Sequence, residues 1–240
     1  MITTILQIYR RTNYLKEQLS AIDAQTIKSE KIFIVHNEGG VQFDIPKRKD
    51  IQYFYISPNL KFHPRFALGL LAQTEYVFFY DDDTIPGSRW HENCINTIKK
   101  HDCLCGANGR NILPSLGQLC PAGWGKPSDE ETEVDFVGHA WALRTDNLKY
   151  MWYDGRIHEP LNGEDIMLSA NLQIYGNIPT FVPPHPPNNL SLWGSNPEKA
   201  RKYGSDEHSH WLVRKEHYEE REQLTQHFVN KGWKLMYQKQ

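Results

Sequence analysis

The sequence contains no long apolar stretch and no secretory signal pattern. None of its apolar runs is long enough to span a bilayer. Met1 is followed directly by a strand-like run, where a signal peptide would have a charged and then an apolar region. We therefore expect a cytoplasmic protein without a transmembrane segment.

Cysteine is scarce, and neither sign of charge predominates. The four cysteines do not have the spacing of a zinc site, so we expect free thiols in a reducing compartment. The formal net charge of -2 gives no broad attraction to nucleic acid or to an anionic membrane. A hydrophobic content of 39% is typical of a globular protein, and 240 residues can bury one sizeable core. The function must therefore be sought in local motifs.

Short strand-like runs alternate with helical patterns near the start of the chain. Four runs have the β-branched and aromatic content of buried strands: residues 2–9, 31–36, 51–56 and 76–80. Strands that alternate with helices at this interval form right-handed βαβ units. The sequence therefore predicts an α/β fold with a mostly parallel central sheet.

Polar side chains gather at the carboxyl ends of these predicted strands. They are Gln7, Arg11, Asn37, Asn59, Arg65 and Asp81 to Asp83. Each of them alone is more often a turn or surface residue. Because ligands bind at the carboxyl ends of strands in such sheets, their convergence predicts a binding site at this edge.

Three adjacent aspartates, Asp81, Asp82 and Asp83, follow the apolar run 76–80. Bare carboxylates so close together repel one another, and a hard divalent cation with oxygen ligands relieves that repulsion. The alternative is that Asp82 and Asp83 only form a turn or cap a helix that begins near Ser88. The neighbouring polar groups favour the metal site.

The second half of the chain contains three further segments of interest. Residues 105–133 are rich in Gly and Pro, which predicts a functional loop or a peripheral hairpin. Residues 134–143 are expected to form one strand, in which Gly138 allows a ligand to approach the backbone. Glu164 and Asp165 begin an apolar helix, where they serve either as capping residues or as catalytic carboxylates.

In this order the motifs resemble those of metal-dependent nucleotide-sugar glycosyltransferases with the GT-A fold, of the family 2 type. The segments 6–11 (LQIYRR), 35–37 (VHN), 59–65 and 81–84 (DDDT) are also similar to the exostosin catalytic domain of family 64. The resemblance spans about residues 1–190. It implies a Rossmann-like three-layer sandwich and one domain over residues 1–240. The implied parts are a nucleotide-binding half at 1–86, an acceptor and catalytic half at 87–190, and a helical extension at 191–240.

The resemblance also implies a role for each motif residue. The nucleotide of a UDP-sugar donor would be surrounded by Gln7, Tyr9, Arg11, Asn37, Asn59, Arg65, Asp81 and Asp82. Asp83, together with Asp81 and His185, would bind Mn²⁺ or Mg²⁺. Asp165 would act as the catalytic base with support from Glu164, in a hexosyl- or N-acetylhexosaminyltransferase.

Two departures from the family patterns keep alternatives open. His36-Asn37 stands where family 2 enzymes often have an aspartate, so another base than uracil is possible. Glu164 stands where the exostosin type has an aspartate, so the stereochemical outcome is open, with inversion favoured. The acceptor hydroxyl could belong to a glycan, a lipid-linked sugar, a protein or a modified nucleic-acid base. Candidates for the wall of the acceptor site are His139, Trp141, Trp193, Trp211 and the segment 105–133.

Two other functions compete with glycosyl transfer. A sugar-1-phosphate nucleotidyltransferase has a similar sheet, but its Gly-rich phosphate loop has no counterpart at residues 10–13 (RRTN). Release of pyrophosphate from UTP would favour that activity. A non-catalytic carbohydrate-binding relative would bind sugar without metal or nucleotide.

Overall fold

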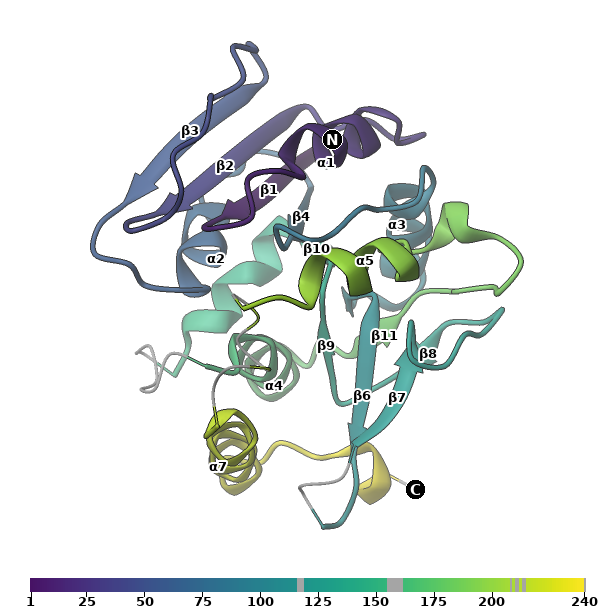
Figure 1. Cartoon of the computed structure of the whole chain (residues 1–240). Coiled ribbons are helices and arrows are strands. Elements are labelled where there is room, and N and C mark those ends of the chain that lie inside the picture. Colours follow the sequence, from purple (N-terminus) through teal and green to yellow (C-terminus); the bar gives the residue numbers. More distant parts are fainter. Residues whose placement is uncertain (116–118, 155–161, 208, 210–211, 213–214, 240) are drawn as a thin grey trace.

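The computed structural model describes residues 1–115, 119–154, 162–207, 209, 212 and 215–239. Its main feature is an eight-stranded sheet with the order β3-β2-β1-β4-β10-β5-β11-β8 (Figure 1). The strands are β1 (Ile2–Ile8), β2 (Lys31–Asn37), β3 (Ile51–Ile56), β4 (Tyr76–Tyr80), β5 (Leu104–Cys105), β8 (Thr132–Glu133), β10 (Trp141–Arg144) and β11 (Thr180–Val182). A smaller antiparallel sheet has the order β7-β6-β9, from β6 (Asn108–Ile112), β7 (Leu119–Gly123) and β9 (Phe136–Gly138).

The helices surround the larger sheet. The α-helices are α1 (Leu15–Asp23), α2 (His63–Gly69), α3 (Trp90–His101), α4 (Glu164–Gly176), α5 (Pro197–Gly204) and α7 (His217–Asn230). Short 3-10 helices are η1 (Thr145–Trp152), η2 (Leu190–Leu192) and η3 (Met236–Gln238). Among the described residues, no helix is both long enough and apolar enough to cross a membrane.

The order of the first four strands creates a switch point between β1 and β4. These strands are parallel, and the chain runs outward from β1 through β2 to β3. It then returns to place β4 on the other side of β1. At such a point the loops after neighbouring strands diverge and leave a crevice at the carboxyl edge. The residues after β1 and β4 therefore face a common space.

Alternating side chains of β4 divide the core into two layers. Val77 and Phe79 belong to a buried cluster with residues of α2, η1, α4 and α7. Tyr76, Phe78 and Tyr80 belong to a second cluster with residues of α1 and α3. Because side chains alternate between the faces of a strand, each face of the sheet is covered by helices. The expected three-layer α/β arrangement is confirmed.

The predicted single strand at 134–143 is wrong, because the structure divides it into β9 and β10. The break falls at His139 and Ala140, whose φ values of 60° and 65° lie in the left-handed region. An extended strand does not pass through two such residues, and the chain moves from the smaller sheet to the larger one. The segment expected as a loop or hairpin does contain the β6-β7 hairpin, whose residues 116–118 lie outside the described part. The division into two halves and an extension stays a prediction.

A buried histidine makes the stability of the fold depend on pH. His91 of α3 is fully buried, and its ring nitrogens contact the Ile27 carbonyl at 2.8 Å and the Tyr80 hydroxyl at 3.0 Å. Burial lowers the pKa of His91 to about 4. The unfolded chain binds this proton near pH 6.5, so the free energy of unfolding should fall between pH 6.5 and 4, by roughly 3 kcal/mol.

Replacing His91 by glutamine should reduce this pH dependence. At pH 7 we expect His91→Gln to be less stable, because it disturbs two buried hydrogen bonds. The difference from the wild type should shrink toward pH 4. Urea unfolding at pH 7, 5.5 and 4 measures both effects, and equal slopes in the two proteins would contradict the assignment.

Candidate functional site

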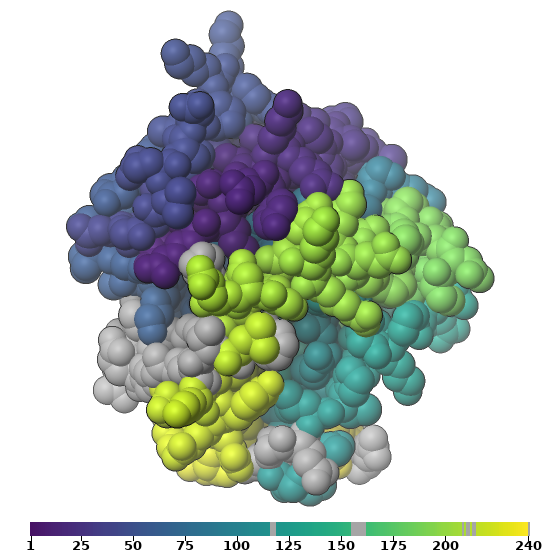
Figure 2. Space-filling view, viewed as in Figure 1, coloured from purple at the N-terminus to yellow at the C-terminus, as the bar shows by residue number. Residues whose placement is uncertain are grey.

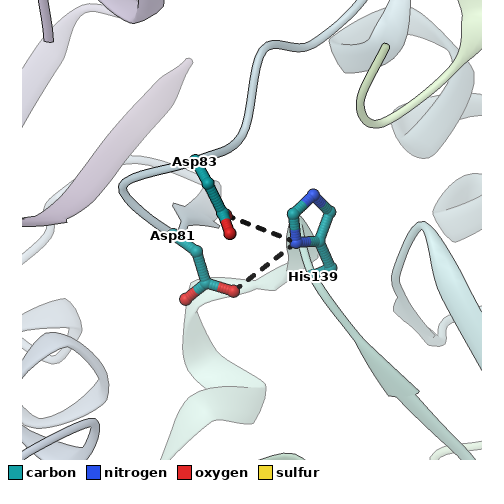
Figure 3. A group of neighbouring side chains, drawn as sticks. All are labelled: Asp81, Asp83 and His139. Carbon is teal, nitrogen blue, oxygen red and sulfur yellow. Dashed lines mark ion pairs between the residues drawn. The ribbon is translucent and has the colours of Figure 1, made fainter. Parts of the chain in front are cut away.

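The switch point places two aspartates beside a histidine. Asp81 directly follows β4, and His139 lies two residues before β10. The two strands are antiparallel, with Trp141 paired to Phe79, so the end of β4 meets the start of β10. Asp83 reaches the same point from the turn after β4 (Figure 3). The left-handed turn at residues 139–140 thus places the His139 imidazole beside Asp81 and Asp83.

Asp81, Asp83 and His139 have a geometry suited to a metal ion. His139 Nδ1 lies 3.7 Å from both Asp81 Oδ2 and Asp83 Oδ1 (Figure 3). One ligand atom from each of the three residues falls within 4.8 Å of the others. The other ring nitrogen, Nε2, lies 3.3 Å from Thr84 Oγ1. A contact of that kind at the far nitrogen fixes the orientation of a ligating imidazole.

The residues present fit a divalent cation. Asp83 Oδ1 is buried and has no hydrogen-bond partner among the described residues. A buried carboxylate oxygen without a partner is costly unless a cation occupies the space it faces. Two carboxylates and an imidazole are suitable ligands for Mn²⁺, and carboxylates are suitable for Mg²⁺.

His185, the predicted third ligand, lies outside this cluster. Its ring packs between Trp90 and Trp193, with centroids 5.4 and 5.3 Å away. Its Nδ1 donates to the Pro183 carbonyl at 2.7 Å, and its backbone pairs with Ser128. His185, three residues after β11, therefore packs between two tryptophans, whereas His139 lies beside the aspartates.

The three aspartates experience different electrostatic environments. Burial and the adjacent Asp83 raise the pKa of Asp82 to about 7, against the pull of Arg11. Burial also raises the pKa of Asp83, although His139 acts in the opposite direction. Burial acts to raise the pKa of Asp81 as well, but Arg65 and His139 outweigh it and hold that pKa below its ordinary value. Even with Arg11 beside them, the ionised forms of Asp82 and Asp83 are therefore disfavoured, and a nearby cation would stabilise them.

The turn that carries the aspartates is held by helix α1. Gln18 is fully buried, and its Nε2 donates to the Asp81 carbonyl at 2.7 Å and to the Thr84 carbonyl at 2.9 Å. The helix α3 begins after Arg89 and has no side-chain cap. Asp82 and Asp83 therefore do not cap it, although they do form a turn after β4, in which the Thr84 backbone donates to the Asp81 carbonyl at 3.1 Å.

A pocket beside the cluster brings together most of the predicted nucleotide-binding residues. It encloses about 780 Å³, including space open to solvent. Its lining residues are Gln7, Tyr9, Arg10, Arg11, Asn37, Asn59, Lys61, Phe62, Asp81 and Asp82. We call it the β1 pocket.

The amide side chains of the β1 pocket converge on Lys61. Gln7 Nε2 and Asn37 Nδ2 both donate to the Lys61 carbonyl, the latter at 2.6 Å. Asn59 Oδ1 accepts from the Lys61 backbone at 2.8 Å. The other amide oxygens, Gln7 Oε1 and Asn37 Oδ1, are buried and have no partner among the described residues. Such acceptors favour a ligand that offers N–H or O–H donors, as a base and a ribose do.

Arg65 is not among the residues that line the β1 pocket. It is fully buried in α2, donates to Asp81 Oδ1, and lies 3.1 Å from Glu164 Oε1. Its guanidinium stacks on Trp141, 4.4 Å from the ring centroid. Arg65 therefore links the aspartate motif to the start of α4.

A second pocket lies on the other side of Asp81, which lines both. It encloses about 1210 Å³, including space open to solvent. Its lining residues are Asp81, Asn108, Arg110, Leu119, Trp124, Phe136, Gly138, His139, Trp141, Glu164, Asp165, His217, Tyr218 and Arg221. We call it the α4 pocket. It contains both predicted catalytic carboxylates and two of the predicted wall residues, His139 and Trp141. Trp193 instead packs against His185, and Trp211 lies outside the described residues.

Asp165 is clamped by an arginine from the C-terminal part of the chain. Arg221 of α7 donates through both terminal nitrogens to the two carboxylate oxygens, each at 2.8 Å. The Ile166 backbone also donates to Asp165 Oδ1 at 2.9 Å, so this carboxylate contributes to the helix start as well. A side chain at Gly138 would place its Cβ 3.4 Å from Asp165 Oδ2, so glycine keeps that approach open.

Glu164 is buried beside Asp165 and Arg65. Burial and Asp165 raise the pKa of Glu164 to about 7, although Arg65 and Arg221 act against that rise. The start of α4 thus holds two carboxylates in different environments. One faces the pocket in a bidentate ion pair, and the other joins α4 to Asp81 through Arg65.

The helix α5 covers the side of the site on which Asp83 lies. Gly204 packs on Asp83, and a Cβ there would lie 2.4 Å from Asp83 Oδ2. Beyond it, Asp206 accepts two hydrogen bonds from Arg11, at 2.7 and 2.9 Å. In Figure 2, α5 crosses the middle of the visible face. No local pattern marks Arg221, Asp206 or Gln18 as site residues, because each contacts a partner far away in the chain.

Comparisons with known proteins yield structural relatives only. No protein-family model matches the chain, and no curated protein matches its sequence. The S. aureus TarS 1–349 structure in complex with UDP has a TM-score of 0.52 and 15% identity, over 96% of this chain and 71% of that chain. The complex with UDP-GlcNAc has a TM-score of 0.52 and 14% identity, over 95% and 71%. A longer TarS structure has a TM-score of 0.50 and 16% identity, over 95% of this chain.

The chain spans only 43% of that longer TarS structure. At identities of 14–16% the likeness shows the fold alone. It confirms the fold class expected from the sequence, α/β with a mostly parallel central sheet.

Proposed function

We propose that this protein is a metal-dependent glycosyltransferase that moves a sugar from a UDP-sugar to an acceptor hydroxyl. The observation that carries the proposal is the position of the Asp81, Asp83 and His139 cluster between two pockets that share Asp81. A donor with its nucleoside in the β1 pocket would bring its diphosphate to the cluster. The sugar would then point into the α4 pocket.

The donor side is supported by the chemistry of the β1 pocket. Gln7 and Asn37 supply amide acceptors for a base, and Arg11 supplies positive charge next to Asp82 and Asp83. Asp81, Asp83 and His139 would hold Mn²⁺ or Mg²⁺. When bound, such a cation neutralises diphosphate charge and stabilises the departing UDP. S. aureus TarS binds UDP and UDP-GlcNAc in the structures similar to this chain, which supports a uridine nucleotide.

Asp165 is the proposed base of an inverting transfer. The acceptor oxygen forms a bond to the anomeric carbon, and the bond from that carbon to the diphosphate oxygen breaks. The acceptor proton goes to Asp165, and UDP leaves with the electron pair. Asp165 Oδ1 accepts from both Arg221 and the Ile166 backbone, whereas Oδ2 accepts only from Arg221 among the described residues and retains a lone pair for the proton. Gly138 keeps the approach to this carboxylate open.

A thermal-shift panel tests the proposal directly. UDP-, GDP- and dTDP-sugars are compared with and without Mn²⁺. A ligand at 100 times its Kd stabilises the native state by about 2.7 kcal/mol. We therefore expect a UDP-sugar with Mn²⁺ to raise Tm by roughly 5 °C or more, and less without the metal.

Two outcomes of the panel would contradict the proposal. One is no stabilisation by any nucleotide sugar. The other is equal stabilisation with and without metal. Release of pyrophosphate from UTP would instead favour the nucleotidyltransferase.

A further inference from the structure

The α4 pocket contains a positive charge that the transfer chemistry does not use. Arg110 on β6 lines this pocket. Its Nη1 donates to Asn108 Oδ1 at 2.5 Å and to the Gly109 carbonyl at 2.9 Å. Within the described residues, no carboxylate lies within ion-pair distance of Arg110, and its Nε and Nη2 donate no hydrogen bond.

The other arginines at this end of the site are already neutralised. Arg221 forms a bidentate pair with Asp165, and Arg65 pairs with Asp81 and Glu164. Burial and the nearby Arg221 lower the pKa of Arg110, although Asp165 acts in the opposite direction. A partly buried guanidinium close to a second one is unfavourable unless an anion balances it.

The strand register shows where Arg110 lies relative to the transfer point. Asn108 pairs with Gly138, which is next to His139 of the cluster. Arg110 pairs with Phe136, two residues further along both strands. At about 3.4 Å per residue, Arg110 is displaced by about 7 Å from the position beside the cluster. It therefore lies on the acceptor side, beyond the point at which the sugar would be transferred.

Aromatic side chains give the intervening pocket a surface for a sugar ring. Trp124 lies beside His139, with ring centroids 5.2 Å apart, and it lines the same pocket. Tyr218 lines the pocket too, and 64% of its surface is exposed. Amphipathic rings of this kind pack against the apolar face of a ligand and leave its hydroxyls free.

We propose that the acceptor is an anionic saccharide, with a phosphate or carboxylate about one sugar unit from the reacting hydroxyl, and that Arg110 binds this anion. The planar guanidinium matches both groups, because it can donate two parallel hydrogen bonds to their oxygens. This inference rests on the proposed glycosyl transfer and names the class of its acceptor.

The test compares charged and neutral saccharide probes on protein saturated with UDP and Mn²⁺. The probes are methyl glucoside 6-phosphate, methyl glucuronide and neutral methyl glucoside, with affinities measured by NMR titration. We expect at least one anionic probe to bind about tenfold more tightly than methyl glucoside, since charge-assisted hydrogen bonds have that strength. Arg110→Met should abolish the preference, and Arg110→Lys should retain part of it.

Lys126→Met is the matched control. Lys126 is exposed on the same hairpin region, outside the residues that line the α4 pocket, and its removal changes the net charge equally. The preference should survive in this variant. Equal affinities for charged and neutral probes, no binding of either anionic probe, or equal losses in Arg110→Met and Lys126→Met would overturn the inference.

The UDP thermal shift separates this inference from the proposed function. If UDP with Mn²⁺ does not raise the Tm of the wild type, the proposed function itself is contradicted. If the shift is present in the wild type and in Arg110→Met, the variant is folded with an intact donor site. The probe affinities then report on Arg110 alone.

Discussion

Replacing Asp83 by asparagine should lower the rate of Mn²⁺-dependent sugar transfer by about 10³-fold or more. Asp83 Oδ1 is buried without a partner among the described residues, 3.7 Å from His139 Nδ1. The amide keeps the size of the side chain but removes its charge, so a divalent cation loses one of its two carboxylate ligands. The measurement is kcat with a saturating UDP-sugar over a series of Mn²⁺ concentrations.

The same substitution should leave the fold intact. Asp82 and Asp83 are adjacent carboxylates, so removal of one charge relieves repulsion when no metal is present. We expect Tm without Mn²⁺ to stay the same or to rise, whereas the Mn²⁺-dependent shift with UDP should disappear. Asp44→Asn, at an exposed site away from both pockets, is the control and should behave as the wild type. Full turnover in Asp83→Asn would refute the metal site.

Replacing Asp165 by asparagine should reduce kcat by about 10³-fold, within the range for loss of a general base. The amide keeps the volume but cannot take the acceptor proton. Because Asp165 lines only the α4 pocket, the Kd for UDP should change little. Single-turnover transfer rates and UDP titrations measure the two quantities separately.

Glu164→Gln distinguishes the two carboxylates. Glu164 accepts a hydrogen bond from the buried Arg65, which joins it to Asp81, so we expect a smaller loss of kcat than in Asp165→Asn. The opposite order, with Asp165→Asn active and Glu164→Gln inactive, would assign the base to Glu164. Asp146→Asn, at an exposed position, controls for the loss of one carboxylate.

The donor side of the site was accessible from the sequence because its information is local. Each of β1, β2 and β4 is a short apolar run, and a polar residue in or just after its last two positions lies at the carboxyl edge of the sheet. Gln7, Asn37 and Asp81 thus meet at one pocket once the strands pair in parallel.

The rest of the site depends on contacts that no local pattern encodes. His139 reaches the aspartates only because β10 inserts antiparallel beside β4, after a turn that breaks the predicted strand. From the sequence, His139 is expected at the wall of the acceptor site, and the family resemblance implies His185 as a late histidine ligand of the metal. Arg221 meets Asp165 because α7 packs against α4. A charged helix in the sequence gives no sign of which arginine turns inward.

Asp81 lines both the β1 pocket and the α4 pocket, and this has an evolutionary consequence. Under the proposed function, a substitution there would alter recognition of two substrates at once, so selection for a new acceptor could not act on it without a penalty in donor use. Arg110, Trp124 and Tyr218 line the α4 pocket but not the β1 pocket. Relatives of this protein should therefore diversify at those positions and on α7, while the turn after β4 remains constant.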